Sequence, residues 1–70
     1  MMPLTMAKPG EEATILKITG KDETRQHLAE LGFVVGGFVT VISEMAGNLI
    51  VQIKDSRVAL DKAMANRIMI

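Results

Sequence analysis

The sequence predicts a small, mainly β domain that rolls into a barrel and carries one α-helix between its first and second strands. Its 70 residues suffice for one domain, so we expect residues 1–70 to form a single unit. Several short segments rich in β-branched and aliphatic residues follow one another at close spacing, which is typical of small barrels. The chain is too short for a parallel sheet with crossover helices.

The first strand is predicted over residues 13–18. Side chains alternate along a strand, so Ala13 and Ile15 share one face, and Leu16 and Ile18 share the other. Both faces are apolar. We therefore expect either a bulge in this strand or a strand that is buried on both faces.

A helix is predicted over residues 23–31. Asp22 is a suitable N-cap, because its carboxylate can accept hydrogen bonds from the free N–H groups of the first turn. Thr24, Leu28 and Leu31 are spaced by four and three residues. This spacing gives the helix a single apolar stripe.

The end of this helix has its own signal. Gly32 can adopt the left-handed conformation that commonly follows a helix, and Phe33 can then fold back onto Leu28 in a Schellman motif. We expect these residues to pack together with Leu31 as one corner.

The remaining elements are predicted in close succession: strands at 38–43, 49–54, 57–60 and 67–70, and a helical turn at 62–66. Side chains alternate along the strand at 49–54, so Leu49, Val51 and Ile53 share one face. Gly47-Asn48 suits a primed hairpin turn between the second and third strands. Asp61 can cap the helical turn before the last strand. This order fits an SH3-like β-barrel.

Composition argues against several classes of function. Eight basic and eight acidic residues give no net charge, and there is no Trp or Tyr on which bases could stack, so nucleic-acid binding is disfavoured. No nucleophile stands out with a base beside it, so we expect no enzyme. The N-terminus lacks the features of a signal peptide, and the longest apolar stretch falls short of the ~20 residues of a membrane span. We therefore expect a cytoplasmic protein that does not insert into a membrane.

A metal site is one hypothesis for the single histidine. His27 can meet Glu23 and Glu30 on one exposed face of the helix, where the three would bind Fe2+ or Zn2+ weakly. The alternative is a solvated histidine with weak pairing. No cofactor is required by either interpretation.

The most apolar stretch, residues 31–38, suggests a binding surface. A small barrel cannot bury all of its large side chains, and an exposed apolar patch often marks a partner site. The alternative is a full corner of the core without a partner. Exposed strand edges and such a patch would also allow homo-oligomerisation.

The chain resembles the FeoA family over nearly its whole length. The opening of the family pattern is matched by Leu4, Gly10 and Glu11. The most specific motif runs from an arginine through a Leu-Gly pair to a second glycine, and it is matched by Arg25, Leu28, Leu31, Gly32, Phe33 and Gly36. Val35 and Leu49 stand where proline is common in the family, which affects loop geometry only.

The resemblance implies an SH3-like fold and a role in bacterial ferrous iron uptake. It also implies a partner, FeoB, which is a membrane transporter with a cytoplasmic GTP-binding part. A related SH3-like domain ends the DtxR-like regulators, so the alternative is a domain that binds or senses a transition metal ion. The predicted partner-binding residues are Arg25, Leu28, Leu31, Gly32, Phe33, Val34, Val35 and Gly36.

Overall fold

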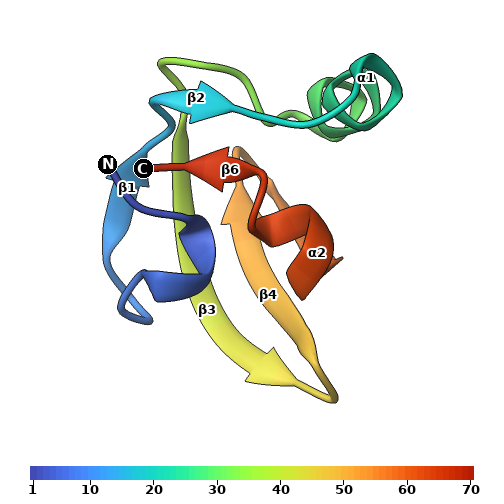
Figure 1. The fold of residues 1–70 in the computed structure, drawn as a ribbon. Coiled ribbons are helices and arrows are strands. Elements are labelled where there is room, and N and C mark those ends of the chain that lie inside the picture. Colours follow the sequence, from blue (N-terminus) through green and yellow to red (C-terminus); the bar gives the residue numbers. More distant parts are fainter.

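The computed structural model describes all residues, 1–70, and confirms a mainly β fold with two helices (Figure 1). A 3-10 turn, η1, opens the chain. The elements in order are η1 (Leu4–Met6), β1 (Glu12–Thr14), β2 (Lys17–Ile18), α1 (Asp22–Leu31), β3 (Phe38–Met45), β4 (Asn48–Ile53), β5 (Ser56–Asp61), α2 (Lys62–Ala65) and β6 (Ile68–Met69).

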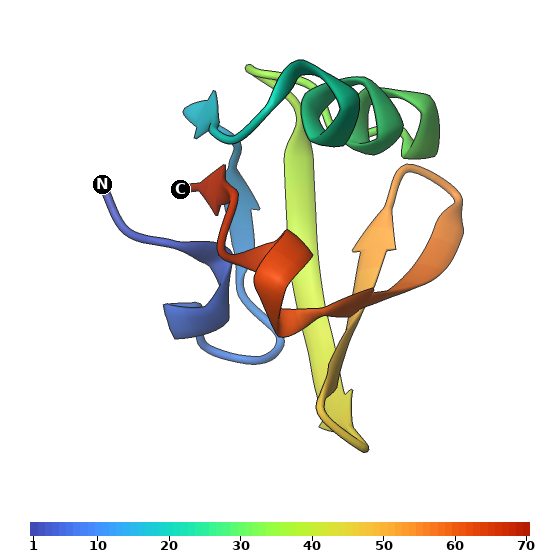
Figure 2. The ribbon, with the colours of Figure 1, turned by 45° about the vertical axis from the view of Figure 1, so that its right-hand side comes forward.

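The strands form two antiparallel sheets and not one closed barrel. The larger sheet has the order β1-β3-β4-β5, and the smaller one pairs β2 with β6. The N-terminal segment joins the smaller sheet through a bridge between Pro3 and Met69 and through paired backbone bonds between Met2 and Ile70. Figure 2 shows α1 lying across one end of the two sheets.

The predicted first strand divides between the two sheets. The Ile15 N–H donates to the carbonyl oxygen of Gly37 at 2.9 Å, whereas the Leu16 N–H donates to that of Met69 at 2.8 Å. The change of partner occurs between two adjacent residues, so Ile15 is fully buried and Leu16 is exposed. Apolar residues on both faces therefore mark a crossing from one sheet to the other.

The start of α1 differs from the prediction. Lys21 is the N-cap, and no side chain caps the helix. Asp22 lies one residue inside the helix, where its carboxylate forms an ion pair with Arg25. The predicted capping role of Asp22 is therefore wrong, although acidic residues in a first turn still favour the helix dipole.

The end of α1 confirms the predicted Schellman motif. Gly32 has a φ of 108°, and its N–H donates to the carbonyl oxygen of Ala29 at 3.0 Å. The Phe33 N–H donates to the carbonyl oxygen of Leu28 at 2.9 Å. These are the two bonds that define the motif.

Two tight hairpins connect β3, β4 and β5. The first turns through Ala46 and Gly47, with φ values of 53° and 82°, as in a type I′ turn. The left-handed pair is thus one residue earlier than the predicted Gly47-Asn48. A register shift between Val41 and Ser43 places a bulge in β3.

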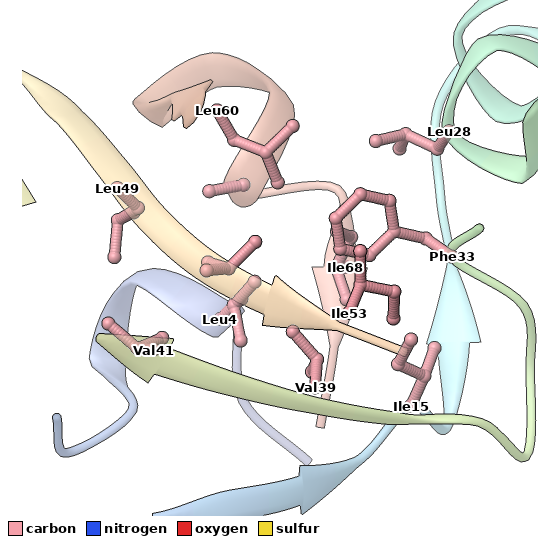
Figure 3. Close-up of a cluster of buried hydrophobic side chains, with 12 residues drawn as sticks. Leu4, Ile15, Leu28, Phe33, Val39, Val41, Leu49, Ile53, Leu60 and Ile68 are labelled. Carbon is pink, nitrogen blue, oxygen red and sulfur yellow. The ribbon is translucent and has the colours of Figure 1, made fainter. Parts of the chain in front are cut away.

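The core is entirely apolar and lies between the two sheets, the two helices and η1 (Figure 3). The predicted alternation in β4 is confirmed, because Leu49, Val51 and Ile53 are all buried. The twelve buried residues are Leu4, Ile15, Leu28, Phe33, Val39, Val41, Leu49, Val51, Ile53, Leu60, Ala65 and Ile68.

Candidate protein-interaction surface

Four exposed apolar side chains lie on the loop between α1 and β3 or beside it. Leu16 is 52% exposed, Val34 44%, Val35 64% and Phe38 58%. We call these four residues the apolar corner. Exposed apolar patches on a protein surface often mark interaction sites.

The main chain fixes the loop of the apolar corner in place. The Gly37 N–H donates to the carbonyl oxygen of Val34 at 3.0 Å, which closes a turn. The Gly36 N–H donates to the carbonyl oxygen of Ile15 at 2.8 Å. The loop thus continues the pairing of β3 with the segment that crosses between the sheets. In Figure 1 the loop passes close to β2, the strand that begins two residues after Ile15.

Strand alternation places Phe38 on the outer face. Phe38 pairs with Thr14 of β1, and the next residue, Val39, points into the core. Leu16 follows Thr14 by two residues, and its N–H donates to the carbonyl oxygen of Met69 in β6. Leu16 and Phe38 therefore flank the loop that carries Val34 and Val35.

The residues predicted to contact a partner do not all reach the surface. Leu28 and Phe33 are fully buried, so their side chains are core and cannot contact a partner. Leu31 and Gly32 are half-buried, whereas Val34, Val35 and Gly36 are exposed. The prediction of a contact at this corner thus applies to the loop after Phe33, and not to the packed residues before it.

Two members of the apolar corner were absent from the predicted set. Leu16 was assigned to a strand expected to be either bulged or buried on both faces, and Phe38 was treated as part of the apolar stretch but not as a contact residue. Alternation from Val39 and Val41 gives a local signal for Phe38. For Leu16 no local signal exists, because its exposure follows from the change of sheet.

Arg25 lies on the exposed surface of α1. Its guanidinium pairs with Asp22, three residues earlier. The two side chains are 52% and 90% exposed. Such a pair contributes only about 0.2–1 kcal/mol, so it leaves Arg25 free to exchange its partner.

The three metal candidates do not form a metal cage. Glu23, His27 and Glu30 are all exposed on α1. The structure contains no group of three or more His, Cys, Asp or Glu side chains placed to hold a metal ion. A tight site needs such a shared cage, so the residues present do not fit a resident metal.

The surface carries no pocket, so the candidate site is an open surface. Neither helix has the length and apolar character needed to cross a bilayer.

Fold and surface together define a small SH3-like β domain with an apolar corner beside its one long helix. The family model described as "FeoA domain" matches residues 2–70. The chain therefore belongs to the FeoA family, as the sequence motifs predict.

Similar proteins agree with this assignment. The candidate Fe(2+) transport protein A of Methanocaldococcus jannaschii is 34% identical over 70 residues, which cover 100% of this chain and 85% of that protein. A crystal structure of an iron uptake regulatory protein, FeoA, is 31% identical, with a TM-score of 0.87, and the match covers 97% of this chain and 90% of that one.

A third relative was solved with a metal. Stenotrophomonas maltophilia FeoA, described as an SH3 domain protein and complexed with zinc, is 27% identical with a TM-score of 0.85. The match covers 99% of this chain and 88% of that one.

Proposed function

We propose that this protein is a cytoplasmic accessory of ferrous iron transport that acts by binding another protein. The proposed partner is the cytoplasmic GTP-binding part of a FeoB-type transporter. Membership of the FeoA family and the relative named for Fe(2+) transport support the process. The partner rests on the family resemblance.

The single observation that carries the mode of action is the apolar corner. Leu16, Val34, Val35 and Phe38 are held on a backbone that is already hydrogen-bonded. A surface fixed before binding loses little conformational entropy when a partner docks. Burying the apolar corner against a partner would remove apolar surface from water, which favours association.

Arg25 is proposed to act at the rim of the contact. Arginine is enriched at interfaces, because its guanidinium can bond in several directions while its stem packs on apolar groups. Its exposed pair with Asp22 costs little to rearrange. An acidic group on the partner could replace Asp22.

The test compares binding of variants to the transporter's cytoplasmic domain by calorimetry, with GDP and with a GTP analogue. We expect the pair Val35→Ser and Phe38→Ser to weaken binding by about tenfold or more, because two apolar anchors are lost. Met45→Ser is the matched control, because Met45 is 66% exposed but lies at the far end of β3.

Unchanged binding by a folded Val35→Ser, Phe38→Ser variant would contradict the assignment of the surface. A difference between the two nucleotides would identify a regulator, whereas equal binding would indicate a scaffold. Absence of binding by the wild type would contradict the proposed partner.

Direct binding of a transition metal ion is the second candidate, and the zinc complex of the S. maltophilia relative favours it. In this chain His27 is the only imidazole and lies exposed on α1. Zinc titration of the wild type and of His27→Ala tests this candidate. Equal weak binding by both would exclude a site at His27.

A further inference from the structure

The outer edge of β5 has no partner strand. β5 pairs on one side with β4 over six consecutive positions without a bulge, and it is the last strand of its sheet. The two-residue turn makes Ile53 and Ser56 a pair that exchanges backbone hydrogen bonds. From this pair on, the backbone N–H and C=O groups of successive β5 residues point alternately toward β4 and away from it. The backbone N–H and C=O groups of Arg57 and Ala59 therefore face away from β4.

The other edges are shorter or guarded. β1 has three residues and begins with Glu12, next to Glu11, and β2 has two residues. The N-terminal edge contains Pro3, which has no N–H to donate. β5 has six residues with no proline or glycine, and proteins normally protect such an edge. Figure 2 shows β5 running past β4 and leading directly into α2.

We propose that this edge pairs with β5 of a second copy of the chain, in an antiparallel arrangement with a two-fold axis at Ala59. In that register Arg57 lies opposite Asp61 of the second copy, and the reverse pair repeats on the other side of the axis. The strand is thus complementary to itself in charge. Opposite charges directly across an antiparallel pair stabilise it, whereas like charges destabilise it.

The side chains on the outer face allow this approach. Arg57, Ala59 and Asp61 alternate with the inward-facing Val58 and Leu60, and all three are exposed. Ala59 is at the axis, where a small side chain meets its own copy without a clash. The backbone groups of Ala59 can then exchange both hydrogen bonds with the same residue of the second copy.

The two charged side chains retain the capacity to pair. The Arg57 Nε donates to the Oε1 of Gln52 at 3.2 Å, which leaves the terminal N–H groups of the guanidinium free. The Oδ1 of Asp61 accepts from the Met64 N–H at 2.8 Å, and Oδ2 remains an acceptor. Lys62, the neighbouring cation, is paired with Glu44 at 2.8 Å.

Two further features favour a second copy as the occupant. The net charge is zero, so two copies do not repel each other at long range. The edge is also separate from the apolar corner, which lies on β3, on its loop and at the crossing to β2, whereas β5 is at the opposite end of the sheet order. Dimerisation therefore does not depend on the proposed transporter contact.

Sedimentation velocity over a concentration series up to about 1 mM tests the proposal. We expect a reversible dimer in the wild type. Ala59→Pro removes the N–H at the axis, which bonds to nothing within the monomer, and should abolish the dimer while the fold is retained. Arg57→Glu places like charges opposite each other twice and should raise the dimer dissociation constant by about tenfold or more.

Lys8→Glu is the matched control for charge, because Lys8 is exposed and lies before β1. It should dimerise like the wild type. A second readout is hydrogen exchange of the Ala59 amide, which should slow as protein concentration rises. If Ala59→Pro does not fold, Arg57→Glu and the amide exchange decide the question.

Three results would overturn the proposal. The first is a wild type that stays monomeric throughout the series. The second is a dimer that survives Arg57→Glu unchanged. The third is exchange at Ala59 that does not depend on concentration.

Discussion

The Phe33 N–H donates to the carbonyl oxygen of Leu28 at 2.9 Å, and both side chains are fully buried (Figure 3). The end of α1 is therefore joined to the core by a backbone bond and by packing at the same point. This attachment fixes the position at which the following loop begins. Val34 and Val35 are exposed directly after a residue that is fully buried.

Phe33→Ala tests this attachment. Removing a buried phenyl ring costs about 3–5 kcal/mol, because the transfer free energy is lost and a cavity remains. A domain of this size has a total stability of only a few kcal/mol. We expect most of the variant to be unfolded at 25 °C, as measured by urea denaturation followed by circular dichroism.

Val35→Ala is the control for Phe33→Ala. Val35 is 64% exposed, and substitutions of surface residues usually change stability by no more than about 0.5 kcal/mol. A folded Phe33→Ala protein with near wild-type stability would show that this corner does not anchor the fold. The contrast also explains why substitutions at Phe33 cannot report on partner binding, whereas those at Val35 can.

The features that local chemistry determines were predictable from the sequence. The Schellman end at Gly32 and the alternation along β4 depend on neighbouring residues only, and both are confirmed. The division of the first strand was not predictable in detail. It depends on Gly37 and Met69, which are distant in sequence and accept bonds from Ile15 and Leu16.

The candidate surface shows the same division between local and distant causes. The apolar content of residues 31–38 predicts an excess over what a small core can hold, and side chains there are indeed exposed. Which aromatic residue is exposed depends on packing: Phe33 fills the space beside Leu28, while Phe38 faces outward opposite Thr14. At the start of α1 the N-cap is Lys21, whereas N-cap propensity favours its neighbour Asp22. Propensity alone therefore predicts the wrong capping residue.

Ala46→Asn should stabilise the protein. Ala46 has a φ of 53° in the turn between β3 and β4, a conformation that costs an L-residue about 1–2 kcal/mol. Asparagine tolerates this region, and Asn-Gly is the preferred pair in a type I′ turn. We expect the free energy of unfolding to rise by about 0.5–1 kcal/mol in urea denaturation.

The matched control for the turn is Ala29→Asn. Ala29 is exposed within α1, where asparagine is a poorer helix former than alanine. The same chemical change should therefore lower the free energy of unfolding there by about 0.5 kcal/mol. If both variants changed the free energy of unfolding in the same direction, the argument from turn conformation would be contradicted.

Asp61→Ala and Asp22→Ala should differ in cost, although both residues lie at the start of a helix. The Oδ1 of Asp61 accepts the Met64 N–H at 2.8 Å, so it satisfies a first-turn donor of α2. Asp22 makes no such bond and contributes an exposed ion pair with Arg25. We expect losses of about 0.5–2 kcal/mol for Asp61→Ala and at most about 0.5 kcal/mol for Asp22→Ala.

Asp61→Asn separates capping from charge at the same position. Asparagine caps as well as aspartate, so most of the stability lost in Asp61→Ala should return, although the charge is still absent. Urea denaturation of the three variants at low protein concentration, where the chain is monomeric, gives the comparison. If Asp61→Asn is as unstable as Asp61→Ala, the contribution of Asp61 is electrostatic, and the bond to Met64 does not hold α2 in place.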